Sequence, residues 1–271
     1  FGIPELDNKA VFQSGLPHVF AGRPGIGKSI FAVEVMWHMT LAGTVLLFSP
    51  EMTKRQVQAR IIARETGVMY STIIRGRMTD QEVEIVSRCA MDIAGRLNRL
   101  KLDTTSGITP EQMRARTERA MKQDGIIAFG VDHLHEMRTG HSSTDRKEFD
   151  RVSICMSGVT EIAKATDLPA LVMCQLSRAV EGRGDKRPSL ADLRGSGAIE
   201  EKAAVVGLLF REGYYAPDPP LHDTLEINVA KNRDGAVGLA TAPLAPAYSR
   251  IGGAPLTFTP SFNCQSDDNP F

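Results

Sequence analysis

A glycine-rich loop near the start of the chain constrains the fold more than any other feature. Residues 22–29 read Gly-Arg-Pro-Gly-Ile-Gly-Lys-Ser, which fits the pattern GxxxxGK[ST] at every fixed position. An apolar run at 16–21 precedes the loop and predicts a strand, and a second run at 30–41 follows it and predicts a helix. In this context the backbone N–H groups and the helix N-terminus can hold phosphate oxygens, so the pattern predicts a nucleotide site.

The same pattern predicts roles for single residues. We expect Lys28 to reach the β- and γ-phosphates and the Ser29 hydroxyl to hold Mg²⁺. The alternative is a glycine-rich turn that fits by chance, and the flanking strand and helix argue against it. The predicted nucleotide-contacting set is Gly22, Arg23, Pro24, Gly25, Ile26, Gly27, Lys28, Ser29 and Ile30.

Apolar runs alternate with helical patterns along most of the chain. This alternation predicts an α/β fold with a mainly parallel sheet flanked by helices on both faces. Helices are expected to begin near Thr53, Asp80, Thr109 and Glu148. Further strands are expected at 44–49, 100–103, 126–131, 168–174, 204–210 and 225–231.

Length and composition limit the domain organisation. A chain of 271 residues can form one large α/β domain, which we place at residues 1–242. Residues 243–271 are rich in Pro, Gly, Ser and Asn and predict a loosely ordered tail. The formal net charge of zero does not argue against a nucleic-acid partner, because an assembled ring can concentrate basic groups in a channel.

The cysteines and the hydropathy indicate a cellular location. The four cysteines lie far apart without a CxxC pair, which predicts buried thiols in a reduced, cytoplasmic protein. No apolar run approaches the roughly 18 residues of a membrane span, so we expect no membrane segment. The chain opens on Phe1 rather than Met, and we expect it to be a fragment.

Two acidic residues follow predicted strands. Asp132 ends the run at 126–131, where an aspartate can hold Mg²⁺, although a helix cap or turn is the common reading of such a residue. Glu51 follows the run at 44–49, where a carboxylate can deprotonate the attacking water; a solvated glutamate is the alternative. The upstream loop favours the catalytic interpretation of Asp132.

Amide and basic residues form the rest of the candidate site. Gln175 follows the strand at 168–174 and can either sense the γ-phosphate or cap the strand. Lys231 and Arg233 flank Asn232 at a strand end, a position suited to cations that act on a neighbouring copy. The basic stretch after Gln175 is either solvated surface or a contact to the backbone of single-stranded nucleic acid; its cations are Arg183, Lys186, Arg187 and Arg194.

Taken together, these motifs resemble DnaB-family replicative DNA helicases. The resemblance covers roughly residues 14 to 240, and its most specific part is the block DKRPSLADLRGSGAIE. It implies a RecA-like fold, a hexameric ring around single-stranded DNA, and ATP and Mg²⁺ bound between subunits. The other matching segments are FSPEMTKRQVQAR, IIAFGVDHLHEM and VAKNRDGAVG.

The resemblance implies a role for each matching residue. Glu51 matches the catalytic glutamate, Asp132 the Walker B aspartate and Gln175 the glutamine linked to the γ-phosphate. Lys231 and Arg233 match a lysine and an arginine finger that act in trans. The family's Walker A pair falls on Lys28 and Ser29, and its DNA-contacting loop on Arg194, Gly195 and Gly197.

The chain departs from the family pattern at several positions. Family members commonly read DYLQ where this chain has Asp132-His133-Leu134-His135, and they have Glu at the position of Gly195. Pro50 replaces the usual Leu before Glu51, which can alter the approach of that carboxylate. We expect the N-terminal scaffold that family members use for ring assembly and primase docking to be absent, so a primase or loader partner is not implied by this segment.

Three functions remain open on the sequence alone. The first is an ATP-driven helicase motor, and the second is a RecA/RadA-like recombinase on the same core. The third is a ring or loader-type module that binds nucleotide without turnover. The DKRP block favours the motor over the recombinase, and the retention of Lys28, Glu51, Asp132 and Arg233 argues against the inert module.

Overall fold

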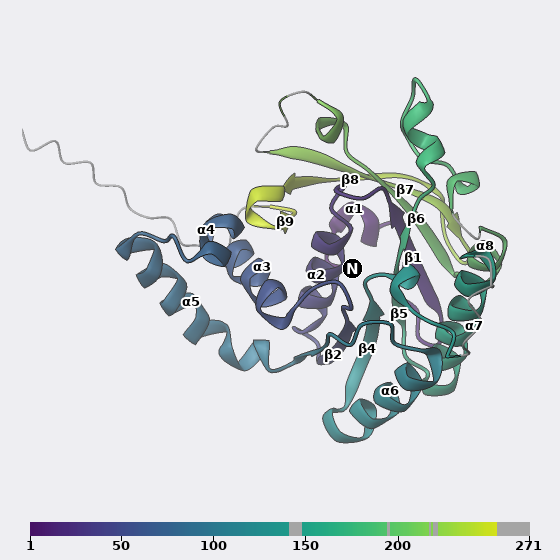
Figure 1. Ribbon diagram of the computed structural model, residues 1–271, viewed down its shortest axis with the longest axis horizontal. Coiled ribbons are helices and arrows are strands. Elements are labelled where there is room, and N and C mark those ends of the chain that lie inside the picture. The colour runs from purple at the N-terminus through teal and green to yellow at the C-terminus, as the bar shows by residue number, and fades with distance from the viewer. Residues whose placement is uncertain (141–147, 194–195, 217, 219–221, 254–271) are drawn as a thin grey trace, which may run out of the picture.

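Among the described residues, nine strands form one sheet in the order β3-β2-β4-β5-β1-β6-β7-β8-β9 (Figure 1). The computed structural model describes residues 1–140, 148–193, 196–216, 218 and 222–253. The strands from β3 to β6 in this order are parallel, and β7, β8 and β9 join by antiparallel pairs. Their bounds are β1 (Pro17–Gly22), β2 (Thr44–Phe48), β3 (Leu100–Asp103), β4 (Ile126–Val131), β5 (Ala170–Gln175), β6 (Val205–Phe210), β7 (Asp223–Asn232), β8 (Gly238–Ala245) and β9 (Arg250–Ile251).

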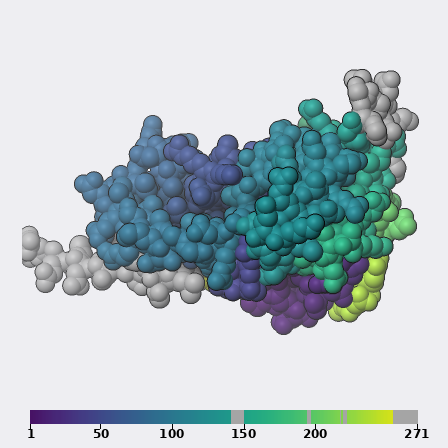
Figure 2. Space-filling model, turned by 90° about the horizontal axis from the view of Figure 1, so that it is seen from below, coloured from purple at the N-terminus to yellow at the C-terminus, as the bar shows by residue number. Residues whose placement is uncertain are grey.

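Helices cover both faces of the sheet, as predicted. Three helices begin with a threonine capping box, in which the threonine and the residue three positions later bond to each other's backbone N–H: Thr53, Thr79 and Thr109. The described helices are α1 (Pro4–Asp7), α2 (Lys28–Met39), α3 (Lys54–Thr66), α4 (Tyr70–Arg75), α5 (Asp80–Leu97), α6 (Pro110–Asp124), α7 (Glu148–Thr166) and α8 (Ser196–Lys202). Figure 2 shows that the segment from α3 to α5 forms a projection at one end of the molecule.

The sheet separates two apolar cores. Because successive strand residues point to opposite faces, Phe20 of β1 packs with α2 and α3, whereas Val19 and Ala21 pack with α6, α7 and α8. Every residue of β1 and β6 is buried, which is the pattern expected of strands covered on both faces. The centre of the sheet is therefore a rigid platform between two helical layers.

The register of the parallel strands brings their carboxyl ends to one edge. Gly22 at the end of β1 lies opposite Gln175 at the end of β5, and Phe48 at the end of β2 lies opposite Val131 at the end of β4. The residues that follow these strands are those predicted to bind and hydrolyse a nucleotide. The strand alternation in the sequence was sufficient to predict this edge.

The predicted boundary between the domain and its tail was wrong. The tail does not begin at residue 243, because β8 runs to Ala245 and β9 pairs with it through Ile251. Proline and glycine are tolerated at this end of the sheet, which is formed by the outermost antiparallel strands. The rest of the predicted tail, residues 254–271, lies outside the described residues.

The close approach of β1 and β6 gives a prediction about stability. Gly207 lies opposite Phe20, and a Cβ atom at Gly207 would be 2.5 Å from the Phe20 ring. Gly207→Ala should therefore lower the free energy of unfolding by about 1–3 kcal/mol, because the buried ring must shift. Urea unfolding measures this change. Gly95→Ala in α5 is the matched control: nothing lies within 4 Å of its Cβ position, and it should be neutral or stabilising.

Candidate nucleotide-binding site

The glycine-rich loop connects β1 to α2, as the sequence predicts. Gly25 and Gly27 have φ angles of +80° and +118°, which side chains of L-residues rarely adopt. Lys28 is buried, and its Nζ donates a hydrogen bond to the carbonyl oxygen of Arg23 at 3.1 Å. Burial lowers the pKa of Lys28, while the nearby Asp132 and Glu51 carboxylates oppose that shift. The ammonium group thus lies between the loop and the acidic residues of the neighbouring strands.

A cleft of about 400 Å³ opens over this loop and is within the range of ligand sites. It brings Glu51 and Gln175 together with the loop, as predicted, and adds Arg60 and His133, which were not among the predicted site residues. Three predicted loop residues, Gly22, Arg23 and Ile26, do not line it. The cleft is lined by Pro24, Gly25, Gly27, Lys28, Ser29, Ile30, Glu51, Arg60, His133 and Gln175.

Arg23 does not line the cleft and is held by other contacts. Its guanidinium donates to the carbonyl oxygen of Leu176 at 2.8 Å and to the Glu181 carboxylate at 2.9 and 2.6 Å. Leu176 directly follows β5, and Glu181 lies in the short helix η2 (Arg178–Gly182) that begins the basic stretch. Arg23 therefore joins the glycine-rich loop to the segment that follows Gln175.

Asp132 is completely buried directly after β4. Neither of its carboxylate oxygens has a hydrogen-bond partner of normal geometry among the described residues. Burial raises the pKa of Asp132, and the Ser29 hydroxyl, His133 and Lys28 oppose this shift only in part. A buried carboxylate beside a hydroxyl supplies the oxygen ligands that Mg²⁺ prefers, so this pair fits the predicted cation site.

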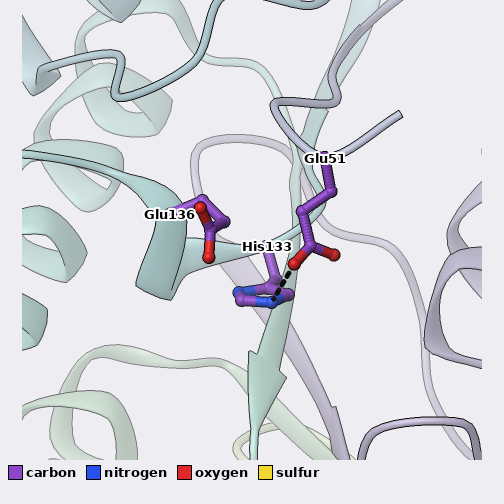
Figure 3. Close-up of side chains that lie close together, drawn as sticks. All are labelled: Glu51, His133 and Glu136. Atoms are coloured by element: carbon purple, nitrogen blue, oxygen red, sulfur yellow. Dashed lines mark ion pairs between the residues drawn. The ribbon is translucent and has the colours of Figure 1, made fainter. Parts of the chain in front are cut away.

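Glu51 and His133 both line the cleft. Figure 3 shows their side chains next to each other. Its Oε1 is 3.3 Å from His133 Nε2, and the Glu51 side chain is 45% exposed whereas that of His133 is 6% exposed. Partial burial and the charge of Glu136 raise the pKa of Glu51, which makes its carboxylate a better proton acceptor. His133 follows Asp132 in sequence, and only the departure from the family's DYLQ pattern singled it out beforehand.

Arg60 of α3 also lines the cleft. Its Nη1 donates to the Ser249 hydroxyl at 3.1 Å, and its guanidinium lies 4.6 Å from the centre of the Tyr70 ring. Ser249 precedes β9, so the C-terminal part of the described chain contributes to the site. An arginine within an amphipathic helix carries no sequence signal for such a role.

Lys231 and Arg233 lie at the opposite edge of the sheet from the cleft. Asn232 between them pairs with Val205 at the start of β6, and Val205 lies beside His18 near the start of β1. The distance along β1 from His18 to the loop is about 13 Å at the usual rise per residue. Both cations donate to backbone carbonyls at the end of α8, Lys231 to Glu200 and Arg233 to Glu201 at 3.4 Å.

The predicted DNA-contacting residues are only partly described. Arg194 and Gly195 lie outside the described residues. Gly197 is exposed in α8, with no atom within 4 Å of its Cβ position. The Arg183 guanidinium forms an ion pair with Asp192, which occupies part of its hydrogen-bonding capacity.

Aromatic rings lie beside the basic stretch, although none interleaves with it in the sequence. Lys186 Nζ is 4.5 Å from the centre of the Tyr215 ring, and the Arg187 guanidinium is 4.8 Å from that of Phe210. Arg187 also forms an ion pair with Glu226 at 2.7 Å. The fold therefore places an aromatic ring against each of these two cations, and the Phe210 ring is itself buried.

The described cysteines are buried within helices and the sheet. Cys89, Cys155 and Cys174 are buried free thiols, as predicted, and burial raises the pKa of Cys174 to about 12. Cys264 lies outside the described part of the chain. None of the described helices has the length and apolar character needed to cross a bilayer.

The loop and the acidic residues at neighbouring strand ends define a P-loop NTPase. The model of the DnaB-like helicase C-terminal domain family matches residues 2–252. The chain therefore belongs to this family, as the sequence motifs predict.

Individual relatives agree with this membership. The replicative DNA helicase DnaC of Bacillus subtilis (strain 168) is 29% identical over 253 residues, which cover 92% of this chain and 55% of the relative. The replicative DNA helicase DnaB of Haemophilus influenzae is 31% identical over 254 residues, which cover 92% and 54%. The chain thus spans about half the length of these relatives.

Solved structures confirm the predicted RecA-like fold. One solved structure, described as an ATPase domain, matches with a TM-score of 0.82 and 25% identity, over 93% of this chain and 90% of that one. A DnaB-like replicative helicase, described with its interactions with primase, matches with a TM-score of 0.81 and 25% identity, over 93% and 60%.

The unpaired carboxylate of Asp132 gives a prediction that separates stability from ligand binding. Asp132→Asn should raise the free energy of unfolding without nucleotide by about 1 kcal/mol, because an amide removes a buried charge whose pKa is raised by burial. The same variant should lose the Mg²⁺-dependent part of nucleotide binding. Thermal unfolding with and without Mg²⁺ and ATP measures both effects.

The matched control is Asp103→Asn. Asp103 accepts hydrogen bonds from Arg116 and Thr105, and its pKa is lowered although burial alone would raise it. That variant should therefore lose stability. A loss of stability in Asp132→Asn as well would show that a partner within the protein holds the Asp132 carboxylate.

Proposed function

We propose that this chain is the ATP-hydrolysing motor part of a replicative DNA helicase and that it acts as a ring of copies on single-stranded DNA. The observation that carries the proposal is the separation of Lys231 and Arg233 from the cleft of their own chain. Cations on the opposite edge of the sheet can complete a nucleotide site only on a neighbouring copy. Head-to-tail contacts of this kind form a ring when the rotation between copies closes and a filament when it does not, and the family resemblance implies a closed hexamer.

Within one copy, the cleft supplies the first half of the reaction centre. Lys28 and the loop N–H groups would hold the β- and γ-phosphates of ATP. Ser29 and Asp132 would hold Mg²⁺, which neutralises the phosphate charge that develops during transfer. Glu51 would accept a proton from the attacking water, and the raised pKa of its carboxyl group suits this role.

The neighbouring copy would supply the second half. Arg233 would stabilise the charge on the transferring phosphoryl group, and Lys231 would contact the phosphates beside it. Among the described residues, the hydrogen bonds of both side chains go to backbone carbonyl oxygens of α8 and not to carboxylates, so no side-chain ion pair has to break before they act. A lone copy is expected to hydrolyse ATP poorly.

Two contacts would link the nucleotide to DNA. Gln175 lines the cleft and is followed directly by Leu176, whose carbonyl oxygen accepts a hydrogen bond from Arg23 of the loop. The basic stretch that begins there contains Arg183 and continues to Arg194, Gly195 and Gly197, which we propose contact the DNA backbone. Loss of the γ-phosphate on hydrolysis would then alter the contacts of Gln175 and Arg23, and through them the position of the DNA-contacting segment.

Membership of the helicase family favours this motor over the recombinase alternative. A related helicase is described with its primase interactions, so a primase or a loader is the partner class to test with this chain. Because a replicative motor acts where the chromosome lies, and the described thiols are free and buried, we place the protein in the cytoplasm.

A strand-displacement assay tests the proposal. A forked DNA with a 5′ or a 3′ tail is incubated with the chain and ATP, and release of the labelled strand is followed. The proposal expects release with ATP on one of the two tails and none with a non-hydrolysable analogue. Equal binding to DNA without any release, at concentrations where ATP is hydrolysed, would support a binding filament instead.

Mixing two inactive variants tests whether the site is shared. Lys28→Ala and Arg233→Ala should each lower ATP hydrolysis by about 10³-fold or more, because each lacks one half of every site. In an equal mixture about a quarter of the head-to-tail interfaces combine an intact loop with an intact finger, so activity should reappear. Steady-state phosphate release measures it. If the mixture stays as inactive as its components, Arg233 acts in its own subunit or not at all.

A further inference from the structure

A second cluster of side chains that could bind a metal lies beside Ser29 and Asp132, the residues proposed to hold Mg²⁺, and shares no residue with them. Glu51, His133 and Glu136 each offer one ligand atom, and these atoms lie within 4.8 Å of one another. Glu51 follows β2, His133 follows β4, and Glu136 lies in the short helix η1 (Leu134–Glu136). Figure 3 shows the His133 ring between the two carboxylates. Because His133 directly precedes η1, the cluster joins two segments, one after β2 and one after β4, around one imidazole.

The imidazole is the fixed member of the cluster. His133 is 5% exposed, and its Nδ1 has no hydrogen-bond partner among the described residues. Its Nε2 lies 3.3 Å from the Glu51 carboxylate. Ligand atoms about 2.1 Å from a tetrahedral Zn²⁺ are about 3.4 Å apart, so these two atoms already have the separation of a shared metal. Neither glutamate is buried, so a change of side-chain rotamer can bring their carboxylates closer to the imidazole.

The donor set selects the kind of cation. Ser29 and Asp132 offer only oxygen atoms, which suit Mg²⁺. An imidazole with two carboxylates instead suits Zn²⁺ and similar transition metals, because nitrogen ligands bind these more tightly than they bind Mg²⁺. The two carboxylates also repel each other, as the effect of Glu136 on the Glu51 pKa shows, and a bound cation would remove that repulsion.

We propose that Glu51, His133 and Glu136 form a site for a divalent transition metal such as Zn²⁺, and that its occupation inhibits ATP hydrolysis. Inhibition follows because the metal would occupy the Glu51 carboxylate that otherwise accepts the proton of the attacking water. This second part rests on the proposed function, whereas metal binding itself does not. The family's usual Tyr at position 133 would not supply the nitrogen, so the site depends on the histidine of this chain.

Metal binding is tested first, without nucleotide. Calorimetric titration of the full chain with Zn²⁺ should show one site per chain. Glu136→Gln and His133→Gln should each weaken binding at least about tenfold, since each removes one ligand. Glu212→Gln is the matched control, because it removes the same charge from an 83% exposed side chain outside the cluster, and it should bind Zn²⁺ normally. Unchanged binding in both cluster variants, or equal binding of Mg²⁺, would overturn the site.

Inhibition is tested second, with saturating Mg²⁺ and ATP. Zn²⁺ should lower phosphate release by the original chain, and Glu136→Gln should need at least about ten times more Zn²⁺ for the same effect. Full activity with Zn²⁺ bound would overturn the inhibitory role but leave the site. If the chain binds Zn²⁺ yet never hydrolyses ATP, the metal site stands and the proposed function fails.

Discussion

The parallel register of β1, β2, β4 and β5 is the constraint on which the candidate site depends. Each of these strands ends at the same edge of the sheet, so residues far apart in sequence meet over the glycine-rich loop. The two helical layers hold that edge rigid, because the strands are buried on both faces. Within this frame, Asp132 can remain buried without a normal hydrogen bond among the described residues, which is costly for folding alone and useful for holding a cation.

The antiparallel strands of the same sheet place the two candidate finger residues at the edge opposite the cleft. β7 returns from the cleft edge to the opposite edge and carries Lys231 and Arg233 with it. A single copy therefore presents an acceptor cleft on one edge and donor cations on the other. This arrangement favours an assembly of identical copies over a self-contained enzyme. The cleft of one copy lacks the two cations, and the cations of one copy lack a cleft, until two copies meet.

Sequence patterns predicted the parts of the structure that depend on interactions between residues close together in the chain. The glycine-rich loop, the strand at 126–131 and the helix that begins after Thr109 each carry their own signal in glycine spacing, apolar runs or capping. Sequence patterns could not predict the continuation of the sheet through Ile251, because β9 is only two residues long and the prolines and glycines around it are typical of a loop. Arg60, and the aromatic rings beside Lys186 and Arg187, depend on contacts between distant segments. Contacts between residues far apart in the sequence do not produce a pattern in the spacing of residue types.

The central claim is that the nucleotide site is completed by a second copy of the chain. The most direct measurement is the rate of ATP hydrolysis per mole of chain across a wide range of chain concentration, with the association state followed by sedimentation in the same buffer. The account predicts a rate that is near zero for the monomer and rises in step with assembly. A constant rate per mole that persists in the monomer would contradict it.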